Sequence, residues 1–187
     1  MNTPAHAAIN LLLLSRNQNH RNSAAIIVGA VIPDLAIMVF YAWQLLLGTP
    51  ENVIWSSEYH RPLWQAWIDG FNSIPLVVLA ILLCWYTRQY LLLVLFGSML
   101  LHIFGDLPLH HDDAHRHFFP LSDWRFASPI SYWDPALHGQ WVSLLEFIGV
   151  LAAASFMCLR RPLLRPWVIA VFTIYLLYWL YVYLVWI

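Results

Sequence analysis

The 187-residue sequence contains no lysine, and charged residues make up only 10% of it. Soluble domains usually carry about 25% charged residues, so this chain has too few to cover an ordinary water-exposed surface. The basic residues are all arginine and the formal net charge is −1, which leaves no basic field to hold a nucleic-acid backbone. The composition therefore excludes an ordinary cytosolic enzyme, a disordered protein and a nucleic-acid binder.

Cysteine is also scarce. Cys84 and Cys158 lie far apart in apolar stretches, a spacing that gives neither a zinc motif nor a disulfide framework. We expect both to be inert buried thiols.

Hydrophobic residues, by contrast, make up 61% of the chain, and eleven Trp contribute to an aromatic content of 16%. Trp and Tyr favour membrane–water interfaces, where one end of the side chain is apolar and the other is wet. The composition predicts an integral membrane protein that forms one domain over residues 1–187 and is embedded in a lipid bilayer.

Five apolar stretches can be recognised, at residues 24–47, 74–86, 90–104, 141–159 and 168–187. A spanning helix needs roughly 20 residues, which the last two supply and the middle two approach with their flanking residues. Residues 87–89 between the second and third predict a tight helical hairpin. The expected fold is all-α, a polytopic helical membrane protein with four or five transmembrane helices.

A shorter apolar segment covers residues 4–15, with Pro4 suited to a first helical turn and Thr3 expected as the N-cap. It is too short to span a membrane, so it predicts an interfacial helix or a helix folded back into the bundle. His6 and Asn10 would share one face of it.

Pro33 interrupts the first long stretch, and two paths follow from it. If residues 24–47 span fully, six arginines share one side, which the positive-inside rule assigns to the cytoplasm. If the chain instead folds back at Pro33, the arginines divide five to four and give no orientation. The six arginines that a full span would place on one side are Arg16, Arg21, Arg88, Arg160, Arg161 and Arg165.

Two signals at helix positions indicate chemistry. His102 and Asp106 are four residues apart, so in a helix they share a face and make half of a divalent metal site; the alternative is a simple pair at the membrane surface. Asp34 follows Pro33 within an apolar run, and an ionisable group at membrane depth is functional by default. The alternative is a carboxylate at a helix end or paired with an arginine.

A third signal is the polar loop at residues 105–139, in which the run 110–117 reads HHDDAHRH. An extended chain would line up His111, Asp113, His115 and His117 on one face, whereas a helix would pair them four apart. Either geometry gathers ligands, and nitrogen with carboxylate suits zinc, manganese or iron better than magnesium or calcium. The alternative is a solvated or pH-responsive loop.

Two further polar residues have open interpretations. Arg125 is suited to hold a phosphate or carboxylate, or to pair with Asp123 or Asp134. Glu146 is expected either to support a histidine ligand or to be an interfacial acid.

The order of these motifs resembles the membrane-bound metal-dependent hydrolase-like family, bacterial inner-membrane proteins related to a LexA-regulated member. The resemblance covers roughly residues 1–130. It rests on P-A-H at residues 4–6, G-A-V-I-P-D at 29–34, H-I-F-G-D at 102–106 and P-L-S-D-W-R-F at 120–126. Where the family has a His-Ser pair before its second hairpin, this chain has Asn72-Ser73, which removes one expected nitrogen ligand.

The resemblance implies a metal-dependent hydrolase whose bound ion, zinc with manganese or iron as alternatives, activates a water against an ester or phosphoester. The metal ligands would be His6, Asp34, His102 and Asp106, joined by His110, Asp113, His115 and His117. Asp34 and Asp113 are the predicted catalytic residues, and Arg125 and Ser73 would steady the head group of a lipid or lipid-linked substrate. Because His6, Asp34 and His102 must then lie together, the hypothesis favours the chain that folds back at Pro33.

Two other classes of function remain open. One is a metal-ion transport or handling protein, in which Asp34 lines a path. The other is a non-catalytic accessory subunit of a larger membrane complex, in which the aromatic residues form the contact surface.

Overall fold

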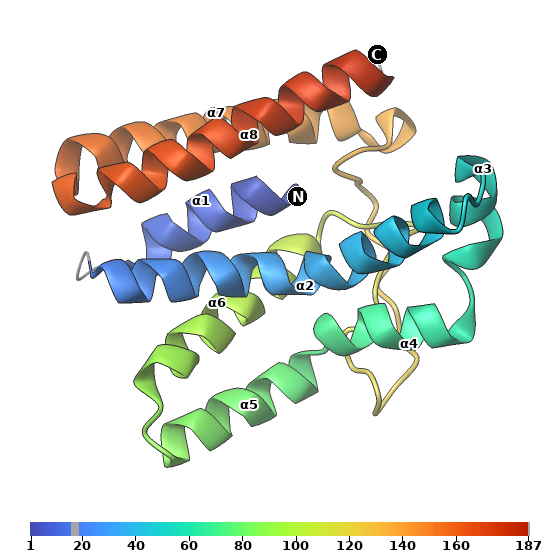
Figure 1. The fold of residues 1–187 in the computed structure, drawn as a ribbon, viewed down its shortest axis with the longest axis horizontal. Coiled ribbons are helices and arrows are strands. Elements are labelled where there is room, and N and C mark those ends of the chain that lie inside the picture. The colour runs from blue at the N-terminus through green and yellow to red at the C-terminus, as the bar shows by residue number, and fades with distance from the viewer. Residues whose placement is uncertain (16–18, 187) are drawn as a thin grey trace.

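The computed structural model describes residues 1–15 and 19–186, and in these ranges the chain is helical with connecting turns and no strand (Figure 1). The predicted all-α class is therefore confirmed. The helices are α1 (Thr3–Leu14), α2 (His20–Leu46), α3 (Glu51–Val53), α4 (Pro62–Phe71), α5 (Ile74–Tyr86), α6 (Tyr90–Asp106), α7 (Gly139–Arg160) and α8 (Arg165–Trp186). The predicted hairpin at residues 87–89 joins α5 to α6.

Three helices in the described residues are long and apolar enough to cross a membrane: His20–Leu46, Gly139–Arg160 and Pro162–Leu184. α4 and α5 meet the same criterion only as a pair, and they are bent by 41° at their junction. These lengths are those expected of a membrane protein, because a hydrocarbon core of about 30 Å needs roughly 20 helical residues.

The predicted reversal of the chain at Pro33 is wrong, because α2 continues through Pro33 to Leu46. Proline removes the helical hydrogen bond that would reach the Gly29 carbonyl, but packing against neighbouring helices can keep the rest of the helix in place. Here α6 packs against this part of α2: Ser98 Oγ donates to the Ile26 carbonyl at 2.6 Å and His102 Nδ1 donates to the Ala30 carbonyl at 2.7 Å. The full-length helix of the alternative prediction is the one found.

The N-terminal helix α1 packs against α2, α6, α7 and α8, so it is folded back into the bundle and is not interfacial. Its N-cap is Asn2, whose side chain accepts from the Ala5 N–H at 3.0 Å, and not Thr3 as predicted. Glu146 holds this end of α1 by accepting from the Asn2 backbone N–H at 3.0 Å and the Tyr175 hydroxyl at 3.3 Å. Glu146 therefore supports a helix terminus and not a histidine.

The described arginines divide between the two ends of the bundle. The α7–α8 turn, the start of α2 and the α5–α6 hairpin lie at the same end (Figure 1), and they carry Arg21, Arg88, Arg160, Arg161 and Arg165. Arg61, Arg116 and Arg125 belong to the other end. This is the division expected for a full span, although Arg16 lies outside the described residues.

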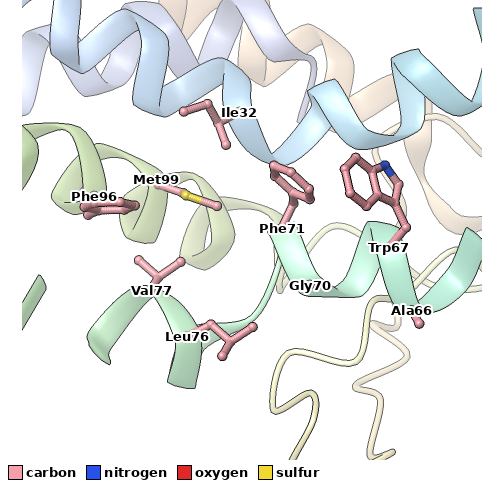
Figure 2. Close-up of a pocket in the computed structure, with 9 residues that line it drawn as sticks. All are labelled: Ile32, Ala66, Trp67, Gly70, Phe71, Leu76, Val77, Phe96 and Met99. Carbon is pink, nitrogen blue, oxygen red and sulfur yellow. The ribbon is translucent and has the colours of Figure 1, made fainter. Parts of the chain in front are cut away.

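A cavity of about 440 Å³ lies between α2, α4, α5 and α6 (Figure 2). Apolar side chains such as Ile32, Phe71 and Met99 line it, and none of its lining residues is titratable. Chemistry must therefore be sought elsewhere in the bundle.

Candidate metal centre

Residues from α1, α2 and α6 converge on one buried point. His6, His102 and Asp106 each offer a ligand atom, and these atoms all lie within 4.8 Å of one another. All three side chains are buried. Asp34 joins the group from α2, with its Oδ1 at 3.5 Å from His102 Nε2. The structure thus brings together the four ligands expected at the core of the site.

One nitrogen of His102 has its proton fixed by its surroundings. A carbonyl only accepts, so the bond to Ala30 places the proton on Nδ1 and leaves a lone pair on Nε2 of the neutral ring. That buried Nε2 has no hydrogen-bond partner, and it lies 2.9 Å from Asp106 Oδ2. A lone pair facing a carboxylate is repelled unless a proton or a cation lies between them. Metal-bound histidines are held through their other nitrogen in this way.

His6 lies flat against His102, with ring centroids 3.6 Å apart and planes inclined by 19°. Its Nε2 hydrogen donates to Asp106 Oδ1 at 2.7 Å. Gly105 makes room for the ring, because a Cβ at Gly105 would lie 3.1 Å from His6 Cε1. The Met1 ammonium also donates to Asp106 Oδ1, at 2.8 Å. Asp106 is thus the carboxylate on which the positive and donor groups of the site gather.

Asp34 connects this buried group to a small cavity of about 140 Å³. Its Oδ2 accepts from the Thr3 hydroxyl at 2.5 Å, while Oδ1 faces His102. The side chain is 21% exposed, whereas Asp106 is 2% exposed. Asp34 is therefore the acid of the group that an incoming molecule can reach.

The loop between α6 and α7 contributes His110. Its Nδ1 hydrogen donates to Asp113 Oδ2 at 2.8 Å, and the unpartnered Nε2 points to Asp106 Oδ1 at 3.5 Å. Burial alone would lower the pKa of His110, but the carboxylates of Asp106 and Asp113 raise it to about 9. A carboxylate behind a histidine that faces a cation site is a recurrent arrangement in metal proteins. His110 therefore faces Asp106 from the loop, beside the group formed by His6, His102 and Asp106.

The loop is neither extended nor helical, contrary to both predicted geometries, and it follows a series of turns. His111 and Asp112 consequently face outward, while His115 and His117 face inward in a row behind His110. Burial lowers the pKa of His115 to about 4. Asp113 contacts His110 and the Trp133 indole and does not reach the central group directly.

Asp69 anchors this loop and was not among the predicted site residues. It is 1% exposed, and it accepts from the Arg116 backbone N–H at 3.0 Å and from Arg116 Nε at 2.5 Å. Arg125 lies at 3.7 Å from Asp69 and donates to Gln65 Oε1 at 2.9 Å, so its predicted pairing with Asp123 or Asp134 is wrong. Asp69 could have been suspected, since it is an acid between apolar residues in a chain with few acids.

We expect Asp69→Ala to release the loop, because the Arg116 backbone N–H and Nε would both lose their buried acceptor, and only the exposed Asp123 would still pair with the guanidinium. Hydrogen exchange of residues 107–138 should accelerate while α7 and α8 keep their protection. Asp112→Ala, whose side chain is 80% exposed, is the matched control. Equal exchange in the two variants would show that Asp69 does not hold the loop.

Two other predicted residues have structural contacts. Ser73 caps α5 by accepting from the Leu76 N–H, and it donates to the Phe119 carbonyl. Asn72 donates to the Ile68 carbonyl at 3.1 Å, and its buried Oδ1 has no partner. The substrate roles of Ser73 and Arg125 remain predictions, and their contacts here tie the loop to α4 and α5.

The arrangement as a whole can hold a divalent cation with two to three imidazole nitrogens and one or two carboxylates. It also has a reachable acid beside a cavity. Searches against protein-family models, curated proteins and solved structures find no match to this chain.

Proposed function

We propose that this protein is a membrane-embedded hydrolase that uses one divalent metal ion to cleave an ester. The observation that supports it best is the buried Nε2 of His102, which has no hydrogen-bond partner and faces two carboxylates. His6, His102 and Asp106 would hold the ion, with His110 as the fourth ligand. Two or three imidazoles with a carboxylate suit zinc first, with manganese and iron as alternatives.

The ion would lower the pKa of a bound water toward about 7. Residues of the chain would transfer the proton and hold the ligands in position. Asp34 would take one proton from the attacking water and pass it to the oxygen of the leaving alcohol. The water oxygen bonds to the acyl carbon and the acyl C–O bond breaks, so that one ester and one water give one acid and one alcohol. Asp113 would keep His110 in position.

Hydrolysis is favoured over ion transport by the packing next to the site. A transport path must continue toward both faces of the membrane. Between the centre and the arginine-bearing end, Asn10 Nδ2 donates to Ser98 Oγ at 2.8 Å, and Ser98 in turn bonds to the Ile26 carbonyl. These buried contacts close that direction. A role as an accessory subunit of a membrane complex remains the alternative if no metal is bound.

The proposed location is the bacterial inner membrane, as the resemblance to the membrane-bound metal-dependent hydrolase-like family implies. Four spans would result if the bent α4–α5 pair crosses as one unit, and five if the shorter α6 crosses as well.

The proposal is tested on the purified full chain in lipid nanodiscs, with metal measured by elemental analysis and turnover measured with p-nitrophenyl butyrate. We expect about one equivalent of metal in the wild type and hydrolysis that stops after chelation. Asp34→Asn should keep the metal and lose about 10²- to 10⁴-fold in turnover, the usual contribution of a general base. His102→Ala should lose both.

Asp112→Asn changes an exposed acid in the loop between α6 and α7, and it is the control for both the metal content and the turnover. A wild-type protein that carries no stoichiometric metal, even after incubation with zinc, manganese or iron, would contradict the proposal. Metal binding without any ester cleavage would contradict the hydrolase part alone.

A further inference from the structure

The small cavity beside Asp34 lies next to the first residues of α1. Thr3, the first residue of α1, bonds to Asp34 near the middle of α2. Beyond this point α2 continues for twelve residues with no α1 beside it (Figure 1). The cavity lies there, with Ile37 and Met38 of α2 on one side and Tyr178 of α8 on the other.

Two candidate membrane spans contribute side chains to the lining of this cavity, and the other lining residues come from the N-terminal segment and the histidine loop: Met1, Asn2, Thr3, His110 and Tyr132. Met38 is 44% exposed, and Ile37 and Tyr178 are partly exposed. In a bilayer, exposed apolar side chains on spanning helices face lipid chains and not water. The cavity therefore leads from the lipid phase to Asp34.

The lining selects against a charged ligand. None of the described arginines borders the cavity. Arg116 and Arg125 of the nearby loop pair with Asp69. Met1 lines the cavity, but its ammonium pairs with Asp106. A phosphate would need free arginine or lysine donors, whereas an uncharged carboxylic ester needs none.

We propose that this cavity is a lateral portal through which the carboxylic ester of a membrane lipid reaches Asp34 from the bilayer, between α2 and α8. The portal rests on the proposed hydrolase function for its role, but binding through it does not need the metal ion. Its existence can therefore be tested separately.

The test uses a long-chain acylglycerol ester that carries a diazirine next to the ester group, incorporated into nanodiscs with the full chain. After illumination, mass spectrometry should locate cross-links at residues around Met38 and Tyr178. Met38→Trp, which fills the mouth, should reduce labelling of Tyr178 at least about tenfold. Val39→Trp is the matched control, because Val39 is 45% exposed on the same helix but does not line the cavity.

Turnover and metal content complete the design. Met38→Trp should abolish cleavage of the bilayer-resident ester with unchanged metal content, while Val39→Trp leaves both as in the wild type. Equal labelling of Tyr178 in the two variants, or labelling confined to other helices, would overturn the portal. Correct labelling in a protein without metal or turnover would leave the portal standing and refute the hydrolase function.

Discussion

Asp106→Asn is expected to weaken metal binding by at least about 100-fold. Loss of residues that merely support a ligand already costs about 10- to 100-fold in metal affinity, and Asp106 is in direct contact with three histidines of the site. Asparagine keeps the shape but removes the charge. A competition titration of the purified protein with a chromophoric chelator measures the change, and elemental analysis checks the occupancy.

The same variant should lose the dependence of stability on metal. A ligand that binds only the folded state stabilises it by about 2.7 kcal/mol at 100 times its Kd. The thermal midpoint of the wild type should therefore rise with added zinc, and that of Asp106→Asn should not. If instead the wild type ignores zinc and the variant is merely less stable, Asp106 is a structural acceptor for Met1 and the histidines. Asp112→Asn should behave as the wild type.

Gly29→Ala should be the most damaging single methyl group that can be added to the bundle. A Cβ at Gly29 would lie 2.1 Å from the Leu95 carbonyl oxygen and 2.9 Å from Ser98 Cβ, so α2 and α6 must move apart. Overpacking of this kind costs about 3 kcal/mol, at the upper end of the usual range. For a chain of this size that corresponds to a fall in the thermal midpoint of roughly 6–12 °C.

Because the Ala30 carbonyl of α2 orients the His102 ring of α6, separation of these two helices should also weaken metal binding in Gly29→Ala. The matched control is Gly97→Ala on α6, where a Cβ meets nothing within 4 Å. Alanine is the better helix former by up to about 1 kcal/mol, so this control should be as stable as the wild type or more so. Equal thermal midpoints for the two variants would show that α2 and α6 do not pack as closely at Gly29 as the structure has them.

The sequence predicted those parts of the site that depend on local geometry. The four-residue spacing of His102 and Asp106 places both on one face once α6 is helical, and the energetic cost of burying Asp34 marks it without any knowledge of its partners. That His6 joins them followed only from the order of motifs, because nothing local specifies which helices pack together.

The errors arose where a distant residue decides a local structure. Pro33 indicates a break, but Ser98 and His102, more than sixty residues later, bond to the α2 carbonyls before it. Thr3 is a good capping residue, but its hydroxyl is taken by Asp34 and Asn2 caps the helix instead. The turns of the histidine loop likewise depend on Asp69, about fifty residues earlier.

The uneven distribution of arginine has a consequence for biogenesis. Arg61, Arg116 and Arg125 lie at one end of the bundle, each within 4 Å of an acidic side chain, whereas the other five described arginines lie at the opposite end. A chain inserted with that other end in the cytoplasm would have the histidine loop translocated before it can close over the centre. We therefore expect the apoprotein to acquire its ion outside the cytoplasm, independently of intracellular metal delivery.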